Sequence, residues 1–211
     1  MSVKVKICGL TRAEDIHIIE SYPVDYLGFI MYPPSPRYVG KDLKHLLSFP
    51  KKTKKVVVFV NPSYEEVKRA LDFGADLIQL HGEESPELAK KVGLNKIIKA
   101  LRIKNELNLE ELRIWKDCYA LLLDTYKRGV PGGTGETFNW EWARLTVNAG
   151  YRIFLAGGIT PENVLLAIEK VKPYAIDLSS GIEKSPGVKD PAKVKLLFER
   201  LKVVRPTTTG S

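Results

Sequence analysis

Short apolar runs alternate with amphipathic segments along nearly the whole chain. Runs of roughly four to eight apolar residues are typical of buried strands, whereas apolar residues spaced by three and four are typical of helices. Two of the amphipathic segments begin at a serine that can cap a helix, Ser63 and Ser85. Strands are expected at residues 3–8, 25–31, 55–60, 76–80, 96–101, 120–124, 152–156 and 174–179. Helices are expected at residues 12–22, 42–49, 63–74, 85–93, 106–117, 140–150, 160–171 and 190–204.

Eight strands in strict alternation with eight helices predict an α/β protein, a single (β/α)8 TIM barrel. Strands as continuously apolar as VVVFV (56–60) fit a parallel sheet that is buried on both faces. A flavodoxin-like or Rossmann sheet would need fewer units or a break in the alternation. We therefore expect one barrel domain over residues 1–205. The last residues, 206–211, are expected to be a frayed tail or a cloning remnant.

The net charge of +8 is spread along the 211 residues in short clusters such as KKTKK (51–55). Such a spread favours a solvated surface, and it can also attract an anionic substrate to a cleft. No basic face with interleaved aromatic residues is evident, so no nucleic-acid partner is expected. No apolar run approaches the roughly 18 residues of a membrane span, and the N-terminus lacks the apolar stretch of a signal peptide. A cytoplasmic protein without membrane contact is expected.

The chemistry of a barrel of this kind collects at the carboxyl ends of its strands. Cys8 follows the first strand, and it is either a packed thiol or a thiolate base. Asp124 ends the sixth strand, as a cap or as a catalytic acid. His81 follows the fourth strand, with a structural role or an assisting one. Arg37 lies in a proline-rich loop, where a guanidinium can clamp a carboxylate with two hydrogen bonds.

The loops after the last two strands carry a signal for phosphate binding. LAGGIT (155–160) contains Gly157 and Gly158, and DLSSGIE (177–183) contains Ser180 and Gly181. Glycines let backbone N–H groups approach a ligand closely, and these two loops often form a phosphate site in such barrels. No group of His, Cys and Asp has the spacing of metal ligands, so no metal is expected. Cys8 and Cys118 are expected to be free thiols.

Several motifs in this order together resemble one family, the phosphoribosylanthranilate isomerases of tryptophan biosynthesis. The matching stretches are KICGLT (6–11), GFIMYPPSPRYV (28–39), VVVFVN (56–61), QLHGEE (79–84), GGTGETFNW (132–140), LAGGITPENV (155–164), DLSSGIE (177–183) and SPGVKD (185–190). Met31 and Tyr32 depart from the residues expected at the end of the second strand. The resemblance spans nearly the whole chain.

The resemblance implies an Amadori rearrangement of N-(5′-phosphoribosyl)anthranilate, with no metal or cofactor. By the same resemblance Cys8 is the general base and Asp124 is the general acid. The remaining implied contacts are to the substrate: Arg37 to the anthranilate carboxylate, Asp177 to a ribose hydroxyl, and Gly158, Ser180 and Gly181 to the phosphate. The segment 125–138 is a candidate lid. A monomer and a homodimer are both compatible with the sequence.

Three other interpretations remain open. The first is another enzyme of the phosphate-binding barrel group. In that group, the isomerase of histidine biosynthesis runs similar chemistry but has an aspartate where Cys8 stands, and indole-glycerol-phosphate synthase needs a lysine and glutamate set that these strand ends do not offer. A non-catalytic barrel that binds a phosphorylated ligand would not need both Cys8 and Asp124. Nucleic-acid binding by the basic surface predicts strongly salt-dependent retention on DNA or RNA.

Overall fold

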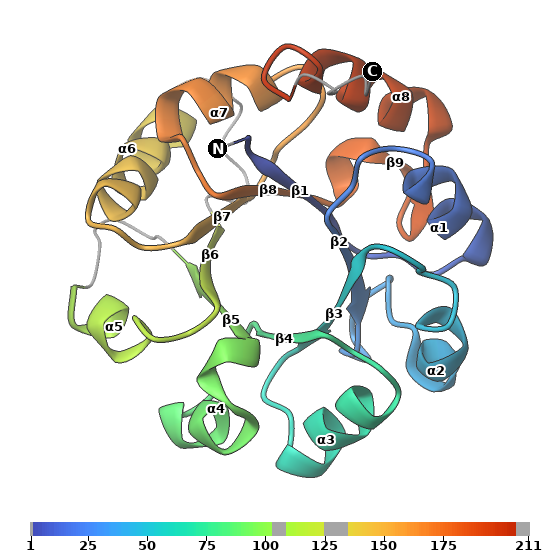
Figure 1. Ribbon diagram of the computed structural model, residues 1–211, viewed down its shortest axis with the longest axis vertical. Helices are drawn as coiled ribbons and strands as arrows, with labels where there is room; N and C mark the ends of the chain where they lie inside the picture. The colour runs from blue at the N-terminus through green and yellow to red at the C-terminus, as the bar shows by residue number, and fades with distance from the viewer. Residues whose placement is uncertain (1, 103–108, 125–134, 206–211) are drawn as a thin grey trace, which may run out of the picture.

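Eight parallel strands close into a ring, and the helices that connect them surround it (Figure 1). This is the arrangement in the computed structural model, which describes residues 2–102, 109–124 and 135–205. The strands are β1 (Lys4–Ile7), β2 (Tyr26–Ile30), β3 (Lys54–Phe59), β4 (Leu77–Leu80), β5 (Ile97–Arg102), β6 (Ala120–Asp124), β7 (Ile153–Ala156) and β8 (Ala175–Leu178). The predicted barrel is confirmed.

Each of these eight strands pairs with the strand that follows it in the sequence, and the pairing of β8 with β1 closes the ring. The helices between them are α1 (Ala13–Glu20), α2 (Leu43–Leu46), α3 (Tyr64–Asp72), α4 (Pro86–Val92), α5 (Leu109–Ile114), α6 (Gly135–Asn148), α7 (Val164–Val171) and α8 (Pro191–Leu201). The candidate lid lies outside the described residues over 125–134, and so does the tail 206–211. Residues 135–138, at the end of the candidate lid, belong instead to the first turns of α6.

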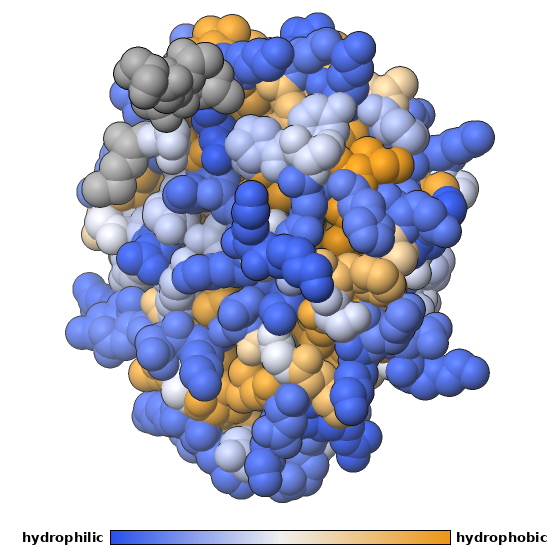
Figure 2. All heavy atoms as spheres, turned by 45° about the vertical axis from the view of Figure 1, so that its right-hand side comes forward, coloured by the Kyte–Doolittle hydropathy of each residue, from blue (hydrophilic) through white to orange (hydrophobic). Residues whose placement is uncertain are grey.

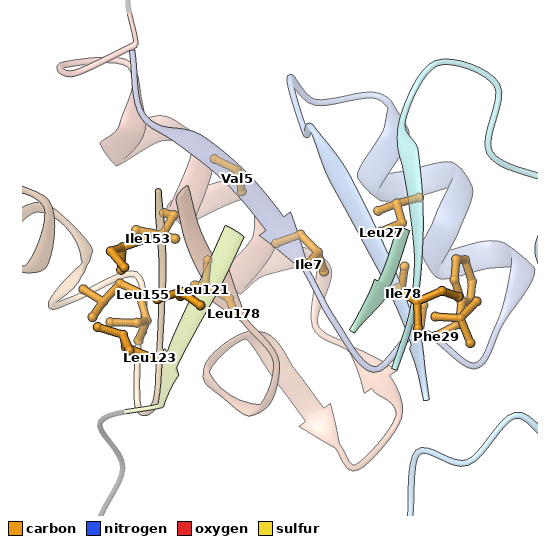
Figure 3. Close-up of a cluster of buried hydrophobic side chains, with 14 of the residues drawn as sticks. Val5, Ile7, Leu27, Phe29, Ile78, Leu121, Leu123, Ile153, Leu155 and Leu178 are labelled. Carbon is orange, nitrogen blue, oxygen red and sulfur yellow. The ribbon is translucent and has the colours of Figure 1, made fainter. Parts of the chain in front are cut away.

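Two apolar layers hold the barrel together. The larger layer lies between the strands and the helices, where side chains such as Ile7, Phe29 and Leu155 are fully buried (Figure 3). A smaller cluster fills the interior of the ring, with Phe154 and Leu122 among its members. Because side chains alternate along a strand, a residue next to an outward Ile7 faces the interior. This parity places Lys6 and Cys8 on the inner side of β1.

Local sequence explains where the helices begin. Ser63 caps α3 through a reciprocal capping box with Glu66, Ser85 accepts a hydrogen bond at the start of α4, and Asp190 accepts two at the start of α8. The helix expected over residues 42–49 is shorter than predicted. It consists of the 3₁₀ turn η1 (Gly40–Asp42) followed by the four residues of α2.

A hairpin interrupts the loop after β8, and the sequence pattern did not predict it. The 3₁₀ turn η3 (Ser180–Ile182) leads into β9 (Glu183–Ser185), which pairs antiparallel with β10 (Val188–Lys189). Gly187 allows the turn because it has a φ of +82°, which other residues rarely adopt. Thr11 holds the hairpin in place by donating a 2.6 Å hydrogen bond from Oγ1 to the carbonyl oxygen of Gly187. The hairpin therefore lies against the loop that follows Cys8.

Hydrophilic side chains cover much of the face seen in Figure 2, and apolar side chains form scattered patches between them. This face does not separate into one polar half and one apolar half. Among the described residues, no helix is long and apolar enough to cross a membrane.

Candidate functional site

Cys8 lies immediately after β1, at the mouth of the barrel. Its backbone N–H donates a 2.8 Å hydrogen bond to the carbonyl oxygen of Leu178 on β8, so the residue continues the pairing of the two strands. The side chain is buried. A Cβ atom at Gly28 on β2 would lie 2.6 Å from the Cys8 sulfur, so the glycine leaves room for the thiol. The strand β2 therefore approaches the sulfur closely.

A buried ion pair lies beside this thiol. Lys6 Nζ is 2.8 Å from Asp177 Oδ2, and both side chains are almost inaccessible to solvent. Burial raises the pKa of the Cys8 thiol, while the ammonium groups of Lys6 and Lys189 act to lower it. Two cations thus favour the thiolate, but burial outweighs them.

Asp124 ends β6 and is part-exposed at the same face of the barrel. An ionisable neighbour is His81, whose Nε2 lies 3.9 Å from Asp124 Oδ2. The other ring nitrogen, Nδ1, lies 2.9 Å from Nε2 of Gln79 on β4. A Gln79 amide that donates to Nδ1 leaves the proton of a neutral imidazole on Nε2, directed toward Asp124. The structure therefore places His81 next to the carboxylate.

Arg37 reaches the mouth from the loop after β2, and it is paired with Glu183 of the hairpin. Its Nε donates to Glu183 Oε1 at 2.8 Å and its Nη2 donates to Oε2 at 2.6 Å. A Cβ atom at Gly9 would lie 2.5 Å from Arg37 Cδ, so the arginine crosses directly over the residue after Cys8. Two of the guanidinium nitrogens are therefore already bound to a carboxylate.

Lys189 completes this cluster from the other strand of the hairpin. Its Nζ donates to the carbonyl oxygen of Cys8 at 2.6 Å, to that of Ser179 at 3.3 Å, and to Glu183 Oε1 at 3.0 Å. Burial lowers the pKa of Lys189, and the charge of Glu183 opposes this effect. The cluster of Arg37, Glu183 and Lys189 fixes the hairpin to the backbone around Cys8.

The loops after β7 and β8 lie against each other. Gly157 and Gly158 have φ values of +92° and +67°, which suit glycine. A Cβ atom at Gly181 would collide with the carbonyl oxygen of Ile159, so the two loops touch through their backbones. Asn163, at the start of α7, donates from Nδ2 to the carbonyl oxygen of Gly158 at 2.8 Å. Ser180 and Gly181 belong to the 3₁₀ turn η3. The two glycine-containing loops that the sequence suggests as a phosphate site therefore lie against each other.

A second buried ion pair supports the mouth at β3 and β4. The Glu84 carboxylate accepts from the backbone N–H groups of Asn61 and Gly82, at 3.0 and 2.8 Å, and from Lys99 Nζ at 2.7 Å. Both charged side chains are buried, at 1% and 4% exposure. Although burial acts against the carboxylate, these donors hold the pKa of Glu84 below its usual value. The QLHGEE motif thus contains a structural anchor.

Replacing Glu84 with alanine is expected to lower the free energy of unfolding by about 3–5 kcal/mol, because it leaves the Lys99 ammonium buried without its partner. Chemical denaturation of the two proteins measures the difference. The matched control is Glu199→Ala, which breaks the exposed 3.9 Å pair with Lys195 and should cost less than about 1 kcal/mol. Equal losses in the two variants would contradict the structural role of Glu84.

Four charged or polar residues around this site were not singled out by the sequence patterns: Lys6, Gln79, Glu183 and Lys189. For Lys6 and Gln79 a signal was present, because each interrupts a strand that must be buried on both faces. Glu183 and Lys189 lacked such a signal, since the hairpin that joins them was not predicted. No group of three or more metal-ligating side chains occurs among the described residues.

Comparisons with known proteins agree with the geometry. The family model of N-(5′-phosphoribosyl)anthranilate (PRA) isomerase matches residues 5–200. An N-(5′-phosphoribosyl)anthranilate isomerase of Aquifex aeolicus is 49% identical over 205 residues, which cover 95% of this chain and 98% of that protein.

Solved structures give the same result. A phosphoribosyl anthranilate isomerase from Thermotoga maritima superposes with a TM-score of 0.85 at 36% identity, covering 95% of this chain and 99% of the other. A second structure of such an enzyme, in complex with reduced 1-(o-carboxyphenylamino)-1-deoxyribulose 5-phosphate, gives a TM-score of 0.82 at 34% identity, covering 95% and 99% of the two chains.

Proposed function

This chain belongs to the N-(5′-phosphoribosyl)anthranilate isomerase family, and from that membership we propose that Cys8 and Asp124 are its general base and general acid. The chain is an isomerase of tryptophan biosynthesis. The observation that best supports the residue assignment is their placement. A thiol and a carboxylate end two strands of one barrel mouth, which the paired loops after β7 and β8 also line.

The first step is opening of the ribose ring. The Asp124 carboxyl donates its proton to the ring oxygen, the bond from that oxygen to C1′ breaks, and the nitrogen lone pair forms a protonated Schiff base. A part-exposed strand end lets this carboxyl reach the substrate. His81 lies 3.9 Å from this carboxyl, and the contact with Gln79 orients its imidazole.

The second step is proton transfer from carbon. The Cys8 thiolate removes the proton from C2′, and the electron pair moves toward the cationic nitrogen to form an enolamine. The enolamine then gains a proton at C1′ and loses the proton of the 2′-hydroxyl, which gives the ketone. Atoms and electrons are conserved, because the product is an isomer of the substrate. The thiolate, and not the thiol, is the form of Cys8 that can accept this proton.

In this proposal, one side of the barrel mouth binds the anthranilate group of the substrate and the other side binds its phosphate. We place the phosphate at the backbone N–H groups of Gly157, Gly158, Ser180 and Gly181. Arg37 binds the anthranilate carboxylate, and Glu183 holds the guanidinium ready for it. Asp177 accepts from a ribose hydroxyl, and its Oδ1 is buried and has no partner among the residues described here. The relative solved with a carboxyphenylamino sugar phosphate supports a ligand with both groups.

The test of the function is the loss of anthranilate-type fluorescence as freshly made N-(5′-phosphoribosyl)anthranilate is consumed. Purified protein should accelerate this loss. If the wild-type protein left the signal unchanged, the isomerase assignment would fail, and a barrel that only binds a phosphorylated ligand would replace it.

Replacing Gly181 with alanine is expected to raise KM by at least about tenfold with a smaller change in kcat, because the added methyl group must push the loop after β8 away from Ile159. The phosphate binds there and does not react. Steady-state kinetics separate the two parameters. Gly150→Ala is the control, since a Cβ atom at Gly150 meets nothing within 4 Å, and its φ of +89° makes it a test of backbone strain without a collision. A KM unchanged in Gly181→Ala would contradict the placement of the phosphate.

A further inference from the structure

A fully buried lysine lies within the barrel, two residues before Cys8 on the same strand. Lys6 has 0% of its surface exposed, and it is among the largest side chains buried to that degree. An ammonium group away from water costs several kcal/mol unless charged partners and hydrogen bonds compensate it. Apolar residues of similar size would fill this space without that cost. The buried charge of Lys6 therefore indicates an interaction with charged or polar neighbours.

Two acceptors face the Lys6 ammonium. Asp177 Oδ2 lies 2.8 Å away, and strand parity places the Cys8 side chain on the same inner side of β1, where its charge acts to raise the pKa of Lys6. Although burial acts to lower it, the charge of Asp177 keeps the pKa of Lys6 above its ordinary value. The lysine therefore remains a cation over the whole neutral range. Its ammonium is bound to the Asp177 carboxylate on the side of β1 that also carries the Cys8 side chain.

The other charged groups that face Cys8 are engaged elsewhere. The three donors of Lys189 are matched by three oxygens, those of Cys8, Ser179 and Glu183. Arg37 is bound to Glu183 through Nε and Nη2. Asp177, on β8, is an anion and acts to raise the pKa of the thiol. Lys6 has three donors and its ammonium is bound to one oxygen, Asp177 Oδ2, so among the described cations near the sulfur it is the one with donors left for the thiolate.

We propose that Lys6 is a positioning residue for the base, whose ammonium stabilises the Cys8 thiolate while Asp177 holds that ammonium in place. This inference rests on the proposed role of Cys8. It also links the base to substrate binding. A ribose hydroxyl that donates to Asp177 weakens the hold of the carboxylate on Lys6, and the ammonium then interacts more strongly with the sulfur. The fraction of Cys8 present as thiolate is therefore larger when the substrate is present.

The proposal predicts opposite effects for the two members of the ion pair. Lys6→Met removes the cation and leaves an anion near the sulfur, so the pH at which Cys8 ionises should rise by at least about one unit, equivalent to a tenfold smaller thiolate fraction. Asp177→Asn removes the anion and leaves Lys6 to the sulfur, so the same midpoint should fall. Charge interactions with the sulfur give shifts of opposite sign, whereas a general disturbance of the barrel mouth would move both midpoints in the same direction.

The experiment measures the rate of Cys8 alkylation by iodoacetamide as a function of pH, in a Cys118→Ser background that leaves one thiol. Lys99→Met is the matched control, because it disrupts another buried lysine pair, the one between Lys99 on β5 and Glu84 after β4, and should leave the midpoint unchanged. If Lys6→Met does not fold, the Lys6→Met/Asp177→Asn protein, which leaves no unpaired charge, is compared with Asp177→Asn. Its midpoint should be the higher of the two.

Unchanged midpoints in both comparisons would overturn the role of Lys6. The readout needs no turnover, so it is independent of the proposed function. An active Cys8→Ser variant would refute Cys8 as the base and leave the effect of Lys6 on the thiol standing. A turnover assay of Asp177→Asn adds a KM comparison, since loss of the hydroxyl contact should also raise KM.

Discussion

Replacing Cys8 with serine is expected to lower kcat/KM by at least about 1,000-fold, which corresponds to about 4 kcal/mol of transition-state stabilisation. The change substitutes one atom and keeps the shape of the side chain, so the packing against Gly28 and the hydrogen bond to Leu178 persist. A serine hydroxyl holds its proton far more tightly than a thiol and cannot remove the C2′ proton at neutral pH. The fluorescence assay with N-(5′-phosphoribosyl)anthranilate measures the loss.

The matched control is Cys118→Ser, at a thiol near the start of β6 and far from the mouth in the fold. Burial raises the pKa of the Cys118 thiol to about 11, so this cysteine is protonated at neutral pH and should not contribute. Its replacement should leave kcat/KM within about twofold of the wild-type value, whereas an active Cys8→Ser protein would rule out the thiolate mechanism.

The alkylation of Cys8 by iodoacetamide has an expected pH dependence in the Cys118→Ser protein. The reaction requires the thiolate and not the thiol. Because burial raises the pKa of Cys8, the thiolate fraction is small at neutral pH and grows as the pH rises. The alkylation rate should therefore still be increasing above pH 8. A plateau that begins below pH 7 would contradict the effect of burial on this thiol.

The barrel could be predicted because its signals are local and repeated. Each apolar strand and each capped helix can be recognised alone, and eight alternations leave few topologies open. The hairpin of β9 and β10 could not be recognised in this way, because Glu183 and Lys189 are polar residues in two very short strands. Their pairing depends on contacts with Arg37 and with the backbone of Cys8, which lie far away in the sequence.

The candidate site could be predicted as a set of positions but not as a set of interactions. Cys8, His81 and Asp124 follow from the rule that chemistry lies at the strand ends, and the structure brings His81 and Asp124 together. The partner of Arg37 did not follow from any rule, since one arginine in a loop can reach many carboxylates. Lys6 is the instructive case. Strand parity assigns it to the interior of the barrel, and a charge there requires a partner, but only the closed ring shows that the partner is Asp177.

Replacing Asp124 with asparagine is expected to lower kcat by about 100- to 10,000-fold, with little change in the affinity for a non-reacting analogue. The amide has nearly the shape of the carboxyl and can donate a hydrogen bond, but it cannot transfer a proton to the ring oxygen. Ring opening then becomes the slow step. Turnover is measured by fluorescence, and binding by titration with reduced 1-(o-carboxyphenylamino)-1-deoxyribulose 5-phosphate, whose sugar is already open.

The matched control is Asp76→Asn. Asp76 precedes β4 at the opposite end of the barrel, where its Oδ2 accepts a 2.8 Å hydrogen bond from the N–H of Lys55, and asparagine keeps an oxygen for that bond. The kcat of this control should be unchanged. An Asp124→Asn protein with kcat within tenfold of the wild type would exclude Asp124 as the acid and leave His81, its neighbour at 3.9 Å, as the group to test next. Loss of analogue binding together with kcat would instead assign Asp124 to substrate binding, because a group that acts only on the ring oxygen has nothing to contribute to an open sugar.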